Sequence, residues 1–317
     1  MLGDRIARVT PFSIVIPVYR NAENIPTLIA RLAELMVGLP AETEVVFVVD
    51  GSPDESYDLL ATALPSAPFR SQLLQHSRNF GSFAAIRTGL AAAQGDAIGV
   101  MAADLQEPPE LMAEFQRVLV SGAVDVAIGR RMSRDDPALS SMSARAFWAV
   151  YRRSVMREMP SGGVDVFGCT RAVAQELAAM TEANTSLVAQ LYWVGFRRAE
   201  IPYSRQVRET GASSWTLRKR VKYLLDSVFS FTNLPLDFLL LTGVTGTFIV
   251  VLVAVLVLAF SLSGAITAPG YAPLMLAILF STFLMITSIG VVGAYIWRIF
   301  ENTKGRPTSI VMSRERW

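Results

Sequence analysis

The stretch SIVIPVYRNAENI at residues 13–25 decides the fold class of this chain. Its first part, Ser13–Val18, is a continuous apolar run rich in β-branched side chains, which is typical of a strand buried on both faces. Pro17 removes a backbone donor near the expected end of that strand. The residues that follow, Asn24–Val37, have the apolar spacing of a helix. A buried strand followed by a helix is the repeating unit of a parallel sheet.

The alternation of strand and helix continues along the chain. We expect further strands at Glu44–Val49, Ala97–Ala102 and Asp125–Ile128, and further helices at Ser82–Gln94 and Glu110–Val120. This order predicts an α/β fold with a mainly parallel sheet covered by helices. Ligands of such sheets bind outside the carboxyl ends of the strands, so the residues after each strand are the candidates for chemistry.

Polar segments follow three of the predicted strands. Tyr19 comes after the first, where its ring could pack on a flat base. Asp50 and Gly51 come after the second; the carboxylate can accept from a base or a ribose, and the glycine allows close backbone approach. Asp104 and Gln106 come after the third, and their oxygens could point at one hard cation such as Mg²⁺. Each motif alone is more often a simple turn, but their order at successive strand ends favours one common site.

The overall composition narrows the class of protein. The formal net charge is +2, and a charge so nearly balanced gives no sign of nucleic-acid binding. The single cysteine, Cys169, cannot form an internal disulfide, which fits a reducing compartment. The first residues, MLGDRIARVTPF, contain no apolar core, so we expect no cleaved signal peptide.

A block without any Asp, Glu, Lys or Arg extends from Phe238 to Trp297. It divides into the apolar runs Phe238–Leu262 and Leu274–Trp297, each with the roughly 20 residues that a bilayer core requires of a helix. The segment between them is rich in Gly, Pro and Ser, as turns are. The block therefore predicts a transmembrane hairpin of two helices, with a pair of buried core helices as the alternative.

The flanks of this block predict its orientation. Basic residues lie on both outer sides and none in the connecting turn, so the positive-inside rule places both ends in the cytoplasm. The residues concerned are Arg218, Lys219, Arg220, Lys222, Arg298, Lys304, Arg306, Arg314 and Arg316. Segment 214–232 mixes basic and aromatic residues, which favours an amphipathic helix at the membrane surface over a solvated linker helix.

These patterns predict four regions in a multi-pass protein of the inner (plasma) membrane. The first, 1–213, is a cytoplasmic α/β domain, and 214–235 is a juxtamembrane amphipathic helix. The hairpin occupies 236–300, and 301–317 is a cytoplasmic tail.

Several segments together resemble a known family. The sequences SIVIPVYRNAENI, VVFVVDGSPDES, RNFGSFAAIRTGL and GDAIGVMAADLQEPPEL are similar to those of family-2 glycosyltransferases with a GT-A, Rossmann-like fold. Within that family the chain resembles the polyprenyl-phosphate glycosyltransferases, relatives of dolichyl-phosphate mannose synthase and bactoprenol glucosyltransferase. The resemblance continues through SGGVDVFGCTRAV, NTSLVAQLYWVGF and RETGASSWTLRKRVKYLLDSVFSF, so it covers nearly the whole chain.

The resemblance implies roles for individual residues. Asp165 matches the proposed catalytic aspartate, and Asp104 with Gln106 matches the metal and diphosphate site, which would hold Mg²⁺ or Mn²⁺. The implied nucleotide-binding residues are Pro17, Tyr19, Asn21, Asp50 and Ser52. The implied residues that grip the lipid phosphate are Arg131, Arg134, Arg208 and Ser213, and arginine suits phosphate geometrically.

The implied reaction is an inverting, metal-dependent transfer of a sugar from a nucleotide-sugar, expected to be UDP-linked, to polyprenyl (undecaprenyl) phosphate. It would take place at the cytoplasmic face of the bilayer and serve cell-envelope glycan or glycolipid modification. The resemblance also implies a homo-oligomer, a tetramer. The only histidine, His76, precedes RNFG, and we expect a structural or surface role for it.

The chain departs from the family pattern near the donor site. Val49 and Ala102 stand where the family has aspartates, and Asn21 stands where a glutamate is common. A catalytically impaired nucleotide-sugar-binding scaffold is therefore an alternative. A processive polysaccharide synthase is disfavoured, because the nearest match to its acceptor motif, 313–317, lacks the glutamine and follows the last span. A transporter is disfavoured because the spans carry no ionisable residue.

Overall fold

The computed structural model describes residues 11–132, 149, 151–153, 155–160, 164–182, 185–204, 217–263 and 271–317. The chain divides into two compact units. Unit 1 comprises residues 1–220 together with 307–317, and unit 2 comprises residues 221–306. We describe each unit by itself.

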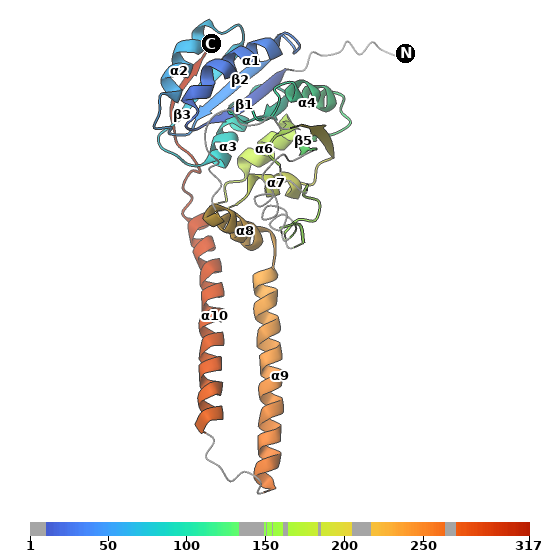
Figure 1. The fold of residues 1–317 in the computed structure, drawn as a ribbon, viewed down its shortest axis with the longest axis vertical. Helices are drawn as coiled ribbons and strands as arrows, with labels where there is room; N and C mark the ends of the chain where they lie inside the picture. Colours follow the sequence, from blue (N-terminus) through green and yellow to red (C-terminus); the bar gives the residue numbers. More distant parts are fainter. Residues whose placement is uncertain are drawn as a thin grey trace. The chain divides into compact units, whose positions relative to one another are not determined.

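Unit 1 contains one eight-stranded sheet with the order β7-β5-β6-β4-β1-β2-β3-β8 (Figure 1). Strand β1 lies next to β2 and β4 and is parallel to both, and the pairs β2–β3 and β5–β7 are also parallel. The pairs β4–β6, β5–β6 and β3–β8 are antiparallel. The strands are β1 Phe12–Val18, β2 Glu44–Val49, β3 Arg70–His76, β4 Ala97–Val100, β5 Val126–Arg131, β6 Phe167–Thr170, β7 Arg198–Tyr203 and β8 Val311–Arg316.

Helices cover both faces of this sheet, as the continuous apolar strands require. On β1, the side chains of Phe12, Ile14, Ile16 and Val18 join one buried cluster with helices α1, α2 and α4. Helix α3 packs on the other face, where a Cβ at Gly89 would lie 2.2 Å from Cγ1 of Val15. The α-helices of unit 1 whose bounds lie within the described residues are α1 Ile25–Met36, α2 Ser56–Ala63, α3 Ser82–Ala92, α4 Leu111–Val120, α6 Arg171–Ala179 and α7 Leu187–Trp193.

The predicted α/β fold with a mainly parallel sheet is therefore confirmed. The predicted strand at Glu44–Val49 has the observed bounds of β2, whereas the strand expected at Ala97–Ala102 already ends at Val100. Helix α3 ends at Ala92 rather than Gln94. Strands β3, β6, β7 and β8 and helices α2, α6 and α7 were not predicted, because their runs are short or mix polar with apolar residues.

Strand β8 returns the end of the chain to the sheet. It pairs antiparallel with β3 from Val311 to Arg316, and the backbone of Trp317 exchanges two hydrogen bonds of 3.0 Å with Ser71. The hydroxyl of Tyr57 donates to Oε1 of Glu315 at 2.6 Å. The segment 301–317, predicted as a tail, thus ends in a strand that covers the edge of β3, and uncovered strand edges invite association with other chains.

Unit 2 is helical, and polar contacts join its first described helix to its last. Its described helices are α8 Leu217–Phe231, which begins in unit 1, α9 Leu234–Leu262 and α10 Tyr271–Thr303. Asp226 on α8 accepts from Nζ of Lys222 at 2.6 Å and from Nη2 of Arg298 at 2.9 Å. The guanidinium of Arg298 also lies 5.1 Å from the centre of the Phe229 ring. These contacts fasten the last turns of α10 to α8.

The membrane prediction is supported in part. Among the described residues, 280–303 in α10 form a segment of 24 residues with mean hydropathy 1.7, long and apolar enough to cross a membrane. A second candidate arises only if the pair 221–231 and 234–246, which bends by 77°, is counted as one span. The second span predicted within α9 stays a prediction.

Removal of residues 307–317 tests the contribution of β8. We expect the shortened protein to unfold at a temperature lower by about 5 °C or more, because it loses a whole strand ladder, and to aggregate through the uncovered edge of β3. Thermal unfolding of the detergent-solubilised protein measures the first effect and light scattering the second. Tyr57→Phe, which removes one hydroxyl, serves as the graded comparison and should cost only about 1 kcal/mol. An unchanged unfolding temperature after the deletion would show that β8 contributes no stability.

Candidate functional site

One edge of the sheet collects the residues that the sequence singled out. Strands β1, β2, β3, β4, β5 and β7 run in the same direction. Their carboxyl ends therefore lie at one edge of the sheet, which we call the carboxyl edge. Strands β6 and β8 run the opposite way, so the residues that precede them also lie there. The strand order reverses at β1, between β4 on one side and β2 on the other, and ligands of α/β sheets bind at such points.

The segment after β1 is fastened to the loop after β2. The backbone N–H of Arg20 donates to Oγ of Ser52 at 2.7 Å, and that hydroxyl donates to Oδ1 of Asp54 at 2.6 Å. The N–H of Ala22 donates to Oδ2 of Asp54 at 3.1 Å. Burial raises the pKa of Asp54, but these hydrogen bonds outweigh it and hold the pKa below its usual value. An ionised Asp54 therefore joins the two loops.

The predicted nucleotide-binding residues differ in how exposed they are and in whether their side chains already form hydrogen bonds. Tyr19 is 40% exposed, so part of its ring is open to a base, while the guanidinium of Arg20 lies 5.5 Å from the ring centre. Pro17 and Asn21 are half-buried, and Pro17 lies within β1 beside Val48 of β2. The hydroxyl of Ser52 is already engaged in joining the two loops. These assignments stay predictions.

Asp50 is buried and bonded on both carboxylate oxygens. Oδ1 accepts from the backbone N–H of Phe80 at 2.8 Å and lies 2.8 Å from Nδ1 of His76. Oδ2 accepts from the N–H of Gly81 at 2.8 Å. Asp50 thus holds the turn that leads into α3, a role that its sequence context did not indicate.

The loop after β2 requires a glycine at position 51, because both its backbone conformation and its surroundings exclude a side chain. The φ of Gly51 is +55°, a conformation that side chains disfavour, and an added Cβ would lie 2.2 Å from the backbone carbon of Arg78. The loop after β2 and the turn after β3 therefore touch through their backbones, as the close approach expected of this glycine implies.

Asp104 and Gln106 flank a tight turn after β4. Leu105 between them has a φ of +54°, and the backbone N–H of Gln106 lies 3.4 Å from Oδ1 of Asp104. The part of the chain that the structure describes holds no group of three His, Cys, Asp or Glu residues able to bind a metal. The donor set nevertheless fits a hard divalent cation, because a carboxylate and an amide oxygen can be completed by substrate phosphates.

Asp165 meets Arg131 and Tyr203 at the far side of the carboxyl edge. Nη2 of Arg131, at the end of β5, donates to Oδ2 of Asp165. The hydroxyl of Tyr203, at the end of β7, donates to the same oxygen at 3.4 Å. The structure thus joins the predicted catalytic aspartate to one of the predicted phosphate-binding arginines, and it adds a tyrosine.

This cluster keeps a defined charge state. Burial favours neutral Arg131, but Asp165 and Tyr203 outweigh burial and raise its pKa above the usual value. Burial, then Asp165 and Glu107, raise the pKa of Tyr203, so its hydroxyl remains protonated. Nε of Arg131 is buried and has no hydrogen-bond partner within the described residues. One donor of a charged group is therefore uncommitted.

Three predicted residues cannot be placed in this way. Arg134, Arg208 and Ser213 lie outside the residues that the structure describes. Sequence reasoning in turn missed His76 as a partner of Asp50, and it missed Tyr203. Both stand at the carboxyl ends of strands that were not recognised, so recognition of β3 and β7 would have revealed them.

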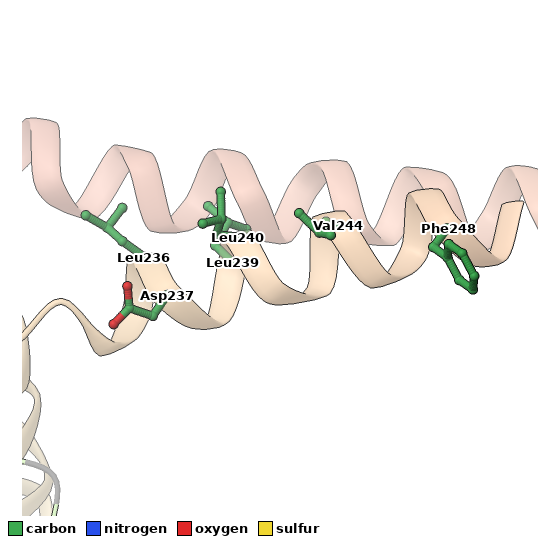
Figure 2. Close-up of a pocket in the computed structure, with 7 residues that line it drawn as sticks. Leu236, Asp237, Leu239, Leu240, Val244 and Phe248 are labelled. Atoms are coloured by element: carbon green, nitrogen blue, oxygen red, sulfur yellow. The ribbon is translucent and has the colours of Figure 1, made fainter. Parts of the chain in front are cut away.

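Two hollows lie elsewhere. One of about 770 Å³ runs along α9 and is apolar apart from one carboxylate (Figure 2); its lining is Leu236, Asp237, Leu239, Leu240, Gly243, Val244 and Phe248. The other, of about 370 Å³, lies between α1 and α2 and is lined on one side by the acidic Glu55 and Asp58. Neither offers the cationic groups that a diphosphate requires, so the carboxyl edge remains the candidate site.

Comparison with known proteins supports this choice. The family model "Glycosyl transferase family 2" matches residues 13–179. An uncharacterized glycosyltransferase of Synechocystis sp. is 31% identical over 299 residues, which are 94% of each chain. A prophage-derived bactoprenol glucosyl transferase of Shigella flexneri is 29% identical and covers 96% of this chain and 98% of its own. An undecaprenyl-phosphate 4-deoxy-4-formamido-L-arabinose transferase of Photorhabdus laumondii is 29% identical over 93% of this chain and 91% of its own.

The matched segment, 13–179, contains β1 to β6 and with them the Asp50, Asp104 and Asp165 positions of the carboxyl edge. With this model over more than half of its length, and a relative of 31% identity across 94% of it, the chain belongs to glycosyl transferase family 2 and is a glycosyltransferase.

Proposed function

We propose that this enzyme transfers a sugar from a nucleotide-sugar to polyprenyl phosphate at the cytoplasmic face of the membrane. The observation that carries the proposal is the Arg131–Asp165–Tyr203 cluster, which lies at the same sheet edge as Asp50 and Asp104. The carboxyl edge thus offers a place for the nucleotide of the donor, and Arg131 offers a positive charge for the phosphate of the acceptor. The acceptor is proposed from the relatives whose names specify bactoprenol or undecaprenyl phosphate.

The donor would lie over the ends of β1, β2 and β4. Tyr19 would stack on the base, and the loops after β1 and β2, joined through Asp54, would hold the ribose. A uridine nucleotide is our choice of base. Asp104 and Gln106 would hold Mg²⁺ or Mn²⁺ together with the diphosphate. When bound, such an ion neutralises charge on the departing diphosphate.

The chemistry proposed for the acceptor is a single displacement. A phosphate oxygen of the lipid forms a bond to C1 of the sugar, while the bond between C1 and the diphosphate breaks and its electron pair leaves with the nucleoside diphosphate. Attack from the opposite face inverts the anomeric centre. The phosphate is already anionic at neutral pH, so no strong general base is needed.

Arg131 and Asp165 would have different roles, Arg131 at the lipid phosphate and Asp165 at the sugar ring. Nη2 of Arg131 is committed to Asp165, and its guanidinium, on a side chain that is 10% exposed, would supply positive charge beside the lipid phosphate. The side chain of Asp165 is 35% exposed and carries negative charge that can stabilise positive charge on the sugar ring. Arg134, Arg208 and Ser213 are proposed as further phosphate ligands.

The membrane part of the proposal places α9 and α10 across the bilayer and α8 at its surface. On α9, Leu240 is 70% and Phe248 is 69% exposed, and such exposed apolar side chains are suited to contact with lipid hydrocarbon. With both termini on the cytoplasmic side, unit 1 would work where nucleotide-sugars are available. A tetramer and a role in envelope glycan or glycolipid modification complete the proposal.

An assay of transfer tests the reaction and the metal site together. Purified protein, Mg²⁺ or Mn²⁺, labelled UDP-glucose and undecaprenyl phosphate should give a labelled lipid, and a panel of other nucleotide-sugars covers other donors. Asp104→Ala or a chelator should lower the rate by about 100-fold or more, because charge on the leaving diphosphate would be uncompensated. Asp58→Asn on α2 is the control and should leave the rate unchanged.

Full transfer by Asp104→Ala would refute the metal assignment. Binding of nucleotide-sugars without any turnover would instead favour the catalytically impaired scaffold. That alternative rests on Val49 and Ala102, which stand where the family has aspartates.

A matched pair of arginine variants tests the acceptor site. Arg131→Ala should raise the KM for undecaprenyl phosphate by about tenfold or more, because a positive charge beside the phosphate is lost. The KM for the nucleotide-sugar should stay the same. Arg130→Ala removes the neighbouring, more exposed arginine, which lies 3.3 Å from Glu200, and should change neither constant. Equal effects of the two substitutions would contradict the role given to Arg131.

A further inference from the structure

His76, the only histidine of the chain, ends β3 and is 1% exposed. Both of its ring nitrogens are engaged: Nδ1 lies 2.8 Å from Oδ1 of Asp50, and Nε2 lies 2.9 Å from Oγ1 of Thr88 on α3. The edge of the ring also meets Phe80 at a centroid distance of 5.6 Å. A polar side chain so thoroughly buried and bonded has a definite orientation.

The contacts continue beyond Thr88 to the end of the chain. Oγ1 of Thr88 lies 2.8 Å from Oγ of Ser309, which precedes β8. One assignment of the protons that satisfies these groups has Ser309 donating to Thr88, Thr88 donating to Nε2 of His76, and Nδ1–H donating to Asp50. This row of four hydrogen-bonded side chains, Ser309, Thr88, His76 and Asp50, therefore links the segment before β8 to the loop after β2.

Asp50 transmits this orientation to two turns at once. Its oxygens accept from the N–H groups of Phe80 and Gly81 at the start of α3, and the backbone of the same turn, at Arg78, touches Gly51. If the His76 contact were lost, one buried carboxylate oxygen would lose a donor that only a polar side chain can replace. The position of Gly51 and the loop that follows would then be less well defined.

We infer that His76 is a positioning residue for the nucleotide-sugar donor, acting through Asp50 on the loop at residues 50–54. This inference rests on the proposed function, since it assumes that the loop meets the donor. It assigns no contact with substrate to His76, and it concerns the donor alone. The acceptor cluster around Asp165 involves no residue of this row.

Three substitutions of His76 separate its two bonds. His76→Phe keeps a ring of similar size and loses both bonds. His76→Asn retains an amide donor near the place of Nδ1 and so keeps the bond to Asp50, whereas His76→Gln reaches the place of Nε2 and keeps only the contact with Thr88. Ser66→Ala, an exposed hydroxyl on another segment, is the control.

With the full-length protein, UDP-glucose and undecaprenyl phosphate, His76→Phe should raise the donor KM by about tenfold, the effect of one lost bond to a charged group. The kcat should stay within about twofold, and the acceptor KM should not change. His76→Asn should recover most of the donor affinity and His76→Gln should not. Ser66→Ala should match the unaltered protein.

Two measurements do not depend on transfer. Amide hydrogen exchange of the peptide that contains Phe80 and Gly81 should be faster in His76→Phe and His76→Gln than in His76→Asn, and UDP should raise the unfolding temperature of these two variants less. If the unaltered protein transferred no sugar, the proposed function would fail while these measurements still decided the role of His76. If His76→Phe did not fold, the Asn and Gln variants would carry the comparison.

Equal donor KM values and equal exchange in the Asn and Gln variants would overturn the inference. So would a His76→Phe protein that unfolds at a lower temperature but binds UDP and uses the donor as well as the unaltered protein does. Such a result would make His76 a residue of the core alone.

Discussion

The rest of unit 1 depends on one constraint, which is that its sheet is buried on both faces. Phe12, Val15 and Phe47 have no exposed surface, and helices lie over each side of the strands that carry them. A strand enclosed in this way has no free face for a ligand, and its backbone N–H and C=O groups are hydrogen-bonded to the neighbouring strands. Polar chemistry is therefore confined to the ends of the strands. The reversal of strand order at β1 leaves a place for a ligand at the carboxyl edge.

At that edge, polar side chains are ordered by bonds to backbone and to one another. Asp54 joins the loops after β1 and β2, Asp50 holds the turn before α3, and Arg131 with Tyr203 holds Asp165. Buried polar groups that are satisfied in this way define one arrangement, whereas unsatisfied ones would destabilise the fold. Groups fixed before a substrate arrives need no reorganisation during transfer, which is the general basis of electrostatic catalysis.

The sequence predicted the parts of this arrangement that follow from local pattern. The apolar runs of β1 and β2 and the polar residues behind them could be read directly, because burial on both faces leaves a continuous signature. The partners of Asp50 could not, since His76 ends a strand, RSQLLQH, that mixes polar and apolar residues. Strand β8, with SRER in its sequence, is polar because it lies at the sheet edge. The bond between Arg131 and Asp165 depends on an antiparallel strand inserted between parallel ones, a topology that periodicity does not reveal.

The proposed donor site lies at the carboxyl edge of the sheet, over the ends of β1, β2 and β4. Photolabelling of the protein with 5-azido-UDP-glucose, followed by mass spectrometry of the labelled peptides, locates the bound donor. We expect labels within 17–22 and 50–54, and their suppression by an excess of unlabelled UDP. Suppressible labelling confined to the hollow between α1 and α2, or to the helices of unit 2, would contradict this placement of the donor.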